Sequence, residues 1–295
     1  RLYLVDFPHV AVYSRETGAW ICTLGREGEG PGEFRQYIGL VRTFQDHQIL
    51  VNSLGKLSWF DGSGKWMREL RTPANIWNVL PAGSGFIGHT LSGTPLEGFK
   101  ALNLYDHRMV WLKELFRKVF LFDESAWKRE LFTANYRYWV HGGVIWVRAQ
   151  SDFVIQRFNE AGKPLPSIVD QAYARVACRE EHKEQVLDYF RKNPRIRPLF
   201  QQFKSRLVFP EYFPAIRTLS FDDDGLYVLT YERQDGQSTF RVYDCSGTFR
   251  RQIALPLATQ NGVAEYPFAI KDRILYQICE NDASGDWEIR VVPFP

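Results

Sequence analysis

The sequence predicts an all-β protein, a six-bladed β-propeller with a helical insertion between blades four and five. Two observations predict this fold: a strand pattern that repeats at the length of one blade, and a composition rich in aromatic side chains. Aromatic residues make up 15% of the 295 residues, as expected of broad strands that stack face to face. The hydrophobic fraction of 45% and the charged fraction of 24% are ordinary for a soluble globular chain. We therefore expect one β-propeller domain over residues 1–295.

The repeat consists of a strand that ends in an aromatic residue, a polar turn, and a second strand. The aromatic markers are Tyr13, Phe60, Tyr105, Phe158 and Tyr243. Their spacings are 47, 45, 53 and 85 residues, and a step of about 40–50 residues matches one four-stranded blade. The Asp, Asn and Gly residues between the strands are typical of hairpin turns. The last spacing equals one blade plus roughly 38 residues, which predicts an insertion before the fifth marker.

The repeat places the blade starts near residues 1, 37, 76, 133, 214 and 266. The first and last units each show three strand patterns, because the first lacks an innermost strand and the last an outermost one. Since sheets must protect their edges, we expect the missing strands upstream of Arg1 or supplied irregularly. The chain opens directly on a strand without an initiator Met, so we expect that processing or trimming has removed a segment upstream. The predicted strands of these two units are Leu2–Asp6, Val10–Ser14, Ala19–Leu24, Phe268–Lys271, Ile274–Cys279 and Trp287–Val292.

A glycine-rich stretch, Gly25–Phe34, lies between the first two units. Its four glycines and one proline exclude the interior of a helix or strand. A phosphate-binding loop is disfavoured because Glu27, Glu29 and Glu33 would repel an anion and no Lys-Ser/Thr follows. A blade-to-blade connector must cross three strand spacings, about 15 Å, and ten residues reach at most about 35 Å. The stretch is therefore predicted to be a connector.

The pattern Gly-x-x-Gly-x-Gly-Pro-Gly-Glu-Phe of this stretch, followed by the strand and turn of Asn52–Gly64, resembles NHL-type six-bladed propellers of bacterial envelopes. The resemblance covers about one and a half blades, and Gln36 and Tyr37 stand where that family usually has a proline. It implies a six-bladed ring that is commonly exported. We expect the protein in the periplasm or cell envelope, either free or anchored by a segment upstream of Arg1. Some NHL-like propellers are metal-dependent lyases with a ring of central histidines, which cannot be mapped onto this chain.

The predicted insertion runs from Asp170 to Leu207 and contains two helical patterns. Gln171–Lys192 lacks Gly and Pro and carries an apolar stripe, and Asn193-Pro194 ends it. A second, shorter helix follows with the spacing i, i+3, i+4, i+7, i+11, at Ile196, Leu199, Phe200, Phe203 and Leu207.

The insertion is also the predicted partner-binding surface, because nine cations and four acids lie between Gln171 and Leu207 in a chain of net charge +3. We expect it to bind a protein partner, including one in a membrane-associated complex, or an anionic membrane surface. The alternative is that its apolar faces cover the propeller and its charges are solvated. The predicted binding residues are Arg191, Lys192, Arg195, Arg197, Phe200, Phe203, Lys204 and Arg206.

A second stretch outside the blade pattern, Phe116–Trp139, is predicted to join blades three and four. It interleaves aromatic with basic residues, a mixture that can bind single-stranded nucleic acid. The net charge of +3 falls short of the wide basic footprint of a nucleic-acid-binding protein. We expect no nucleic-acid partner, and a structural cover or a protein contact in this stretch.

No catalytic or metal-binding set stands out in the sequence. The six histidines show no HxH or HExxH spacing and the four cysteines no CxxC, so free thiols and disulfides both stay open. The run Asp222–Gly225 resembles half a calcium loop, but Arg233 stands where the distal Glu belongs, and a β-turn is expected.

We predict no cofactor and no catalytic metal. The predicted function is a non-catalytic interaction or scaffold module, an accessory subunit that docks on an envelope or membrane-associated complex. The alternative is a small-molecule-binding protein or a lyase- or hydrolase-type enzyme that uses the central funnel.

Overall fold

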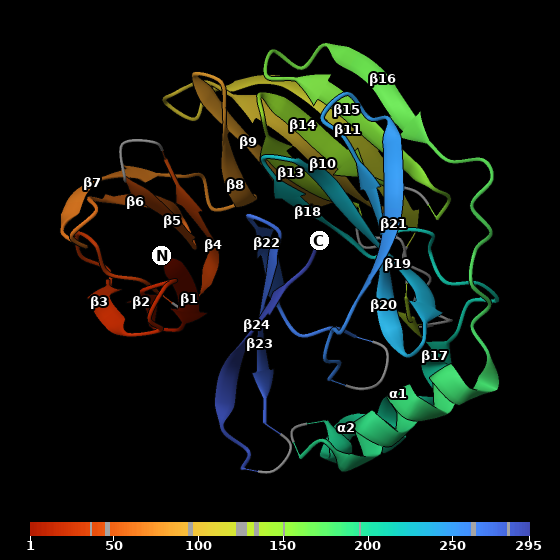
Figure 1. Cartoon of the computed structure of the whole chain (residues 1–295). Coiled ribbons are helices and arrows are strands. Elements are labelled where there is room, and N and C mark those ends of the chain that lie inside the picture. Colours follow the sequence, from red (N-terminus) through yellow and green to blue (C-terminus); the bar gives the residue numbers. More distant parts are fainter. Residues whose placement is uncertain are drawn as a thin grey trace. The chain divides into compact units, whose positions relative to one another are not determined.

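The computed structural model (Figure 1) describes residues 1–35, 37–44, 48–93, 97–121, 129–132, 136–149, 151–194, 196–260, 264–281 and 284–295. The chain divides into two compact units. Unit 1 comprises Arg1–Phe122 with Glu160–Gly162, and unit 2 comprises Asp123–Asn159 with Lys163–Pro295. The single domain over residues 1–295 stays a prediction.

Unit 1 contains three sheets in which each strand pairs with the next one along the chain in antiparallel orientation. Blade one has three strands, β1 (Leu2–Asp6), β2 (His9–Tyr13) and β3 (Trp20–Leu24). Blade two has β4 (Ile38–Thr43), β5 (Ile49–Ser53), β6 (Lys56–Phe60) and β7 (Trp66–Arg71). Blade three has β8 (Ile76–Ala82), β9 (Gly85–Gly93), β10 (Glu97–Tyr105) and β11 (Trp111–Leu121).

Unit 2 contains three further sheets of the same antiparallel design. Blade four has β13 (Arg137–His141), β14 (Val144–Arg148), β15 (Val154–Asn159) and β16 (Pro164–Val169). Blade five has β18 (Thr218–Asp222), β19 (Gly225–Gln234), β20 (Gln237–Tyr243) and β21 (Phe249–Leu255). Blade six has three strands, β22 (Phe268–Lys271), β23 (Ile274–Glu280) and β24 (Trp287–Pro293).

These sheets are the six blades of a β-propeller, which confirms the predicted fold class. The first strand of each blade begins within a few residues of its predicted start, and the first and last sheets have three strands, as the repeat indicates. The helical insertion between blades four and five is also confirmed, with both α-helices between β16 and β18.

One turn recurs after the aromatic marker in five blades. In blade two, Asp61 Oδ1 accepts hydrogen bonds from the N–H groups of Ser63 and Lys65 at 2.8 and 3.0 Å. The third or fourth residue after each turn-opening Ser, Asp or Asn has a positive φ. A positive φ costs a residue with a side chain about 1–2 kcal/mol, so glycine is expected there. The five positive-φ residues are Gly18, Gly64, Met109, Gly162 and Gly247.

The glycine-rich connector ends in a buried aromatic residue, Phe34. Phe34 is fully buried in a core built from both blade one and blade two, which includes Val10 and Phe60. The rings of Phe34 and Phe60 lie 6.0 Å apart. Gly25 has a φ of 72°, and a Cβ at this position would lie 2.1 Å from the Phe34 ring. The Gly-x-x-Gly start of the motif therefore serves to seat its terminal Phe.

The acidic side chains that argue against phosphate help to hold this connector in shape. Glu33 accepts a hydrogen bond from the Gly30 N–H at 2.9 Å and from Arg26 at 2.8 Å. The ammonium of the buried Lys56 donates to the Gly30 carbonyl at 2.7 Å. The connector thus satisfies its own polar groups within unit 1.

The first predicted helix of the insertion is wrong at its start, because α1 spans Glu180–Lys192 and does not begin at Gln171. The preceding segment pairs with the chain ahead of blade five instead. The Cys178 N–H donates to the Glu211 carbonyl at 2.8 Å, and an isolated antiparallel bridge joins the neighbouring residues. Backbone groups bound in this way cannot form the bonds of a helix.

The second predicted helix is wrong at its end. The helix α2 spans Arg197–Phe203, and a 3₁₀ turn, η2 (Lys204–Arg206), follows it. Leu207 already belongs to β17 (Leu207–Val208), which pairs in parallel with β12 (Arg129–Glu130). Strand pairing therefore ends the helical pattern before Leu207.

The predicted non-blade stretch Phe116–Trp139 is also corrected, because β11 runs on to Leu121 as the outer strand of blade three. Its remainder contains β12 and the start of β13, while residues 122–128 and 133–135 lie outside the described residues. Among the described residues of this stretch, Arg117 and Lys118 lie on β11, Arg129 lies on β12, and Phe132 lies in the turn after β12. All four cysteines are free thiols.

Candidate functional site

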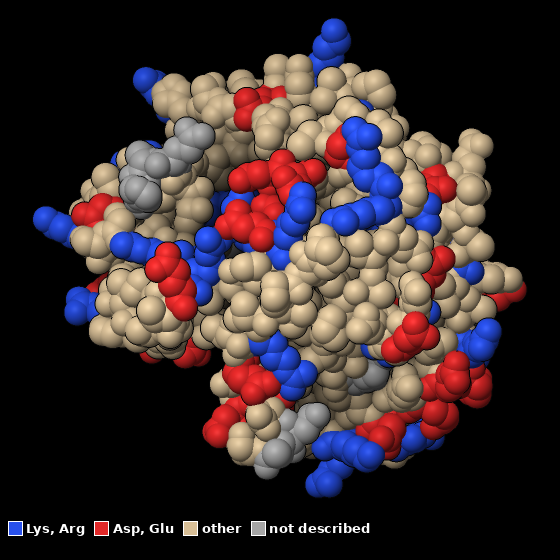
Figure 2. Space-filling view, viewed as in Figure 1, with Lys and Arg blue, Asp and Glu red and all other residues tan. Residues whose placement is uncertain are grey.

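The outer face of the insertion carries both paired and unpaired cations. Arg191 lies 3.2 Å from Glu184, and Lys192 lies 2.6 Å from Asp188. Figure 2 shows acidic and basic side chains interspersed over the helices. These pairs neutralise much of the charge that the sequence predicts for partner binding on α1.

Three exposed cations of the insertion lie close together in the sequence, on α2 and η2. Arg197, Lys204 and Arg206 are exposed, and none of them forms an ion pair with another residue that the structure describes. Leu199 on the same short helix is 55% exposed. Arg195 lies outside the described residues. The predicted binding surface is therefore narrower than the sequence suggests.

The two predicted apolar binding residues lie inside the insertion. Phe200 is only 2% exposed, and its ring lies 5.7 Å from Phe203 and 6.0 Å from Phe190 on α1. Phe203 is half-buried and contacts Phe190 at 5.9 Å. These rings join α1 to α2, and in this structure Phe200 has almost no surface to offer a partner.

The inner face of α1 covers blade five. Val186 is buried in a cluster with Cys178 and Phe213, against which Tyr231 of β19 also packs. The Phe213 and Tyr231 rings stack with centroids 4.2 Å apart. The apolar inner face of α1 therefore packs on blade five, as the alternative considered from the sequence describes.

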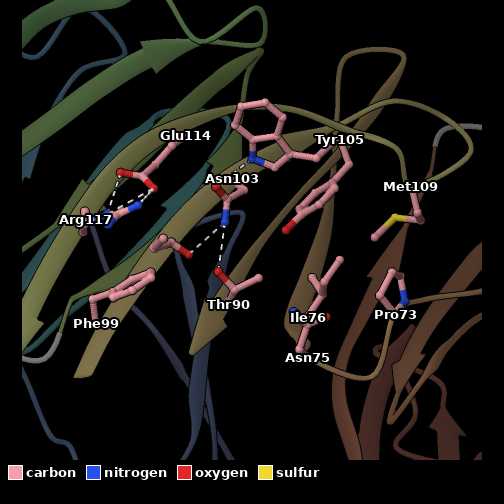
Figure 3. A pocket seen from close by; sticks show the side chains of 12 residues that line it. Pro73, Asn75, Ile76, Thr90, Phe99, Asn103, Tyr105, Met109, Glu114 and Arg117 are labelled. Carbon is pink, nitrogen blue, oxygen red and sulfur yellow. Dashed lines mark hydrogen bonds and ion pairs between the residues drawn. The ribbon is translucent and has the colours of Figure 1, made fainter. Parts of the chain in front are cut away.

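A second candidate site, a pocket of about 420 Å³, lies on one face of blade three. Because side chains alternate along a strand, Phe99, Ala101, Asn103 and Tyr105 of β10 point to the same face (Figure 3). The other lining residues come from β8, β9, β11, the turn between β10 and β11, and the link ahead of β8. They are Pro73, Asn75, Ile76, Thr90, Met109, Trp111, Glu114 and Arg117.

Asn103 is the centre of the polar contacts in this pocket. It is only 4% exposed. Its Nδ2 donates to Thr90 Oγ1 at 3.1 Å and to the Ala101 carbonyl at 3.4 Å, and its Oδ1 accepts a bond from Trp111 Nε1 at 3.1 Å. The buried amide therefore orients the indole of Trp111, which is itself 58% exposed.

The charged residues of the pocket form one pair. Arg117 donates from Nε to Glu114 Oε1 at 3.0 Å and from Nη2 to Glu114 Oε2 at 2.7 Å. The guanidinium carbon also lies 4.1 Å from the centre of the Phe99 ring. Burial raises the pKa of the neighbouring Tyr105, so the phenol is a neutral hydroxyl at physiological pH.

One residue of the pocket, Met109, differs from the residue found at the same position of the repeat in the other blades. It occupies the positive-φ position that is glycine in the other four turns, with a φ of 66°. Its side chain is buried and lines the pocket. Strained residues of this kind concentrate at functional sites.

This pocket was not predicted from the sequence. Most of its lining comes from the second, third and fourth strands of blade three. Two signals were available: Met109 in place of the repeat's glycine, and the polar Asn103 between Ala101 and Tyr105 on this face. Neither signal shows that Trp111 lies within reach of Asn103.

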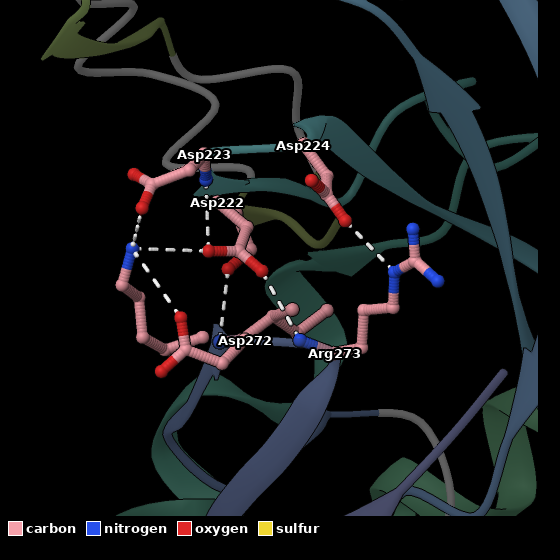
Figure 4. A network of polar contacts seen from close by, with 8 residues as sticks. Asp222, Asp223, Asp224, Asp272 and Arg273 are labelled. Atoms are coloured by element: carbon pink, nitrogen blue, oxygen red, sulfur yellow. Dashed lines mark hydrogen bonds and ion pairs between the residues drawn. The ribbon is translucent and has the colours of Figure 1, made fainter.

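An acidic cluster on unit 2 joins two hairpin turns (Figure 4). Asp222 is the last residue of β18, Asp223 belongs to the turn after it, and Asp272 belongs to the turn after β22. Lys271 Nζ lies 3.1, 2.7 and 3.9 Å from carboxylate oxygens of these three residues. Asp222–Gly225 forms the predicted turn, and the Lys271 ammonium holds the place among these acids that a cation would take.

The chain is similar to solved structures at low sequence identity. A protein from Bacteroides fragilis named "Putative exported protein" has a TM-score of 0.50 and 12% identity, over 92% of this chain and 74% of that chain. A member of the duf4221 family from Bacteroides vulgatus has a TM-score of 0.48 and 9% identity, over 96% of this chain and 86% of that chain. Identities this low show the propeller fold alone.

The other comparisons find no relatives. No protein-family model matches the chain, and no curated protein matches it. Among the described residues, no helix has the length and apolar character needed to cross a membrane. The class of protein is thus a six-bladed β-propeller.

Proposed function

We propose that the protein is a non-catalytic, NHL-like scaffold propeller that acts outside the cytoplasm. In this proposal it docks an acidic protein partner, as an accessory subunit of an envelope complex, on α2 and η2. The observation that carries it is the exposed set of Arg197, Lys204 and Arg206 beside Leu199. Positive charge that has no acid beside it attracts an acidic surface, and Leu199 adds apolar contact area.

The location outside the cytoplasm is part of the same proposal. It is supported by the name of the Bacteroides fragilis structure and by the glycine-rich motif that resembles envelope propellers. In the structure this motif links blades one and two, and its terminal Phe34 is buried between them.

The docking surface is tested with the triple variant Arg197→Glu, Lys204→Glu and Arg206→Glu. The probe is a fluorescein-labelled peptide of alternating Asp and Glu, and its dissociation constant is measured by anisotropy at about 20 and 200 mM salt. Exposed charge pairs contribute about 0.2–1 kcal/mol each, and reversal adds repulsion. We therefore expect affinity to fall at least about tenfold in low salt, and the wild-type affinity to fall as salt rises.

The matched control reverses three exposed cations on unit 1, with Lys65→Glu, Arg71→Glu and Arg108→Glu. It changes net charge by the same amount and should leave peptide affinity within about twofold. An equal loss in both triple variants would show that net charge, and not this surface, attracts the peptide. If the protein binds anionic phosphatidylglycerol vesicles but not the peptide, the result would indicate that this surface binds a membrane and not a protein partner.

A further inference from the structure

We propose that the pocket on blade three binds a neutral saccharide, with a sugar ring stacked on Trp111. This ligand site goes beyond the docking function and lies on unit 1, whereas the docking surface lies on unit 2. Its residues provide an oriented aromatic face, a neutral set of hydrogen-bonding groups, and a volume that suits one or two sugar rings.

The aromatic face is Trp111. An indole that is 58% exposed presents a large apolar surface to water, which is costly unless a ligand covers it. The bond to Asn103 Oδ1 at 3.1 Å orients this indole, and the amide is held in turn by Thr90. The apolar C–H faces of a pyranose ring suit such an oriented aromatic surface, because a preorganised side chain loses little entropy on binding.

The polar groups match hydroxyls and not an ion. Glu114 and Arg117 neutralise each other through two hydrogen bonds. A carboxylate accepts about four hydrogen bonds and a guanidinium donates five, so both keep capacity for a ligand after pairing. Neighbouring sugar hydroxyls can both donate and accept, and they meet this pair without breaking it. A charged ligand would have to compete with the pair for one of its members.

The size and chemistry of the pocket favour binding over catalysis. Its volume of about 420 Å³ lies within the usual range for small-molecule sites, about 300–1,000 Å³. Pro73, Ile76 and Met109 provide apolar contacts around the polar centre. The described lining residues include no His, Cys or Lys, so they form no nucleophile–base pair of the usual kind.

The test is isothermal titration calorimetry with maltohexaose, cellohexaose, xylohexaose and mannohexaose, and with hexagalacturonate as the charged comparison. We expect at least one neutral hexasaccharide to bind and to be preferred over hexagalacturonate. Trp111→Ala should weaken that binding at least about tenfold, because it removes the stacking surface. The matched control is Trp20→Ala, since Trp20 pairs with the blade-one marker as Trp111 pairs with Tyr105 and is 61% exposed.

A second variant, Glu114→Gln, keeps the size of the side chain and leaves Arg117 without its acid. It should weaken the binding of the neutral saccharide and strengthen the binding of hexagalacturonate. A general loss of structure would not change the two affinities in opposite directions. Three results would each overturn the proposal. They are no heat from any neutral hexasaccharide at millimolar concentration, an equal loss of affinity in the Trp20 variant, and a wild-type preference for hexagalacturonate.

Discussion

Lowering the pH should destabilise unit 1 through one buried histidine. His89 lies on β9 and is 8% exposed. Burial, with a smaller effect from Lys100, lowers its pKa from 6.5 to about 4. The unfolded chain therefore binds the proton more tightly than the folded chain. The contribution is fully present above pH 6.5 and is lost as the pH falls towards 4.

The size of this effect follows from the shift in pKa. Each unit of difference between the folded and unfolded states is worth about 1.4 kcal/mol, so full protonation of His89 costs at most about 3 kcal/mol. Between pH 7.5 and 4.5 most of this penalty is incurred. We expect the wild-type free energy of unfolding to fall about 2–3 kcal/mol further than that of His89→Gln over this interval.

The assay is urea denaturation at both pH values, with His107→Gln as the control because His107 is an exposed histidine of the same blade. Comparison of the two pH responses removes the contribution of carboxylates, which all variants share. Parallel responses of wild type and His89→Gln would refute the assignment. A similar change in the His107 variant would show that exposed histidines account for the acid sensitivity.

Three further substitutions test the packing. Phe34→Ala should lower the free energy of unfolding by about 3–5 kcal/mol because the ring is fully buried, whereas Phe249→Ala, at a ring 45% exposed, should cost about 1 kcal/mol or less in the same denaturant titration. Met109→Gly relieves the strain of a positive φ, about 1–2 kcal/mol, but removes a buried side chain whose loss costs about 2–5 kcal/mol. We therefore expect calorimetry to show net destabilisation, and a rise in Tm would contradict this expectation. Arg148 Nη1 donates hydrogen bonds to two carbonyl oxygens at 2.6 and 2.9 Å, and Arg148→Met leaves both without this donor. Chemical denaturation should show a decrease of about 2–4 kcal/mol in the free energy of unfolding. Unchanged stability would mean that water replaces the guanidinium.

The sequence predicts the blades well because each marker is part of a local turn. Asp61, for example, opens a turn whose hydrogen bonds all lie within four residues, so its signature is contiguous in the chain. The start of α1 was missed for the opposite reason. The pairing of Cys178 with Glu211 spans more than thirty residues, and no local pattern around Gln171 reveals it.

The predicted binding residues show the same limit. The spacing of Phe200 and Phe203 indicates an apolar helix face, but it does not say whether that face meets a partner or the neighbouring helix. In the structure both rings contact Phe190 of the neighbouring helix α1, and all three rings pack together. Likewise, the ion pair of Arg191 with Glu184 joins residues seven apart on one helix, and net charge alone does not reveal it.

The blade-three pocket suggests where a repeat protein is best searched for binding sites. Four of the five turns keep glycine at the positive-φ position, because any side chain there is strained. Met109 accepts that strain and lines a pocket whose exposed Trp111 follows two residues later. Where the backbone conformation of a repeat favours glycine, a different residue at that position indicates that its side chain has a role of its own. If the neutral saccharide binds as proposed, Met109→Gly should weaken it even where the fold is retained, because the pocket then loses one apolar wall. Equal affinity in that variant, measured by the same calorimetry, would mean that the methionine serves packing alone.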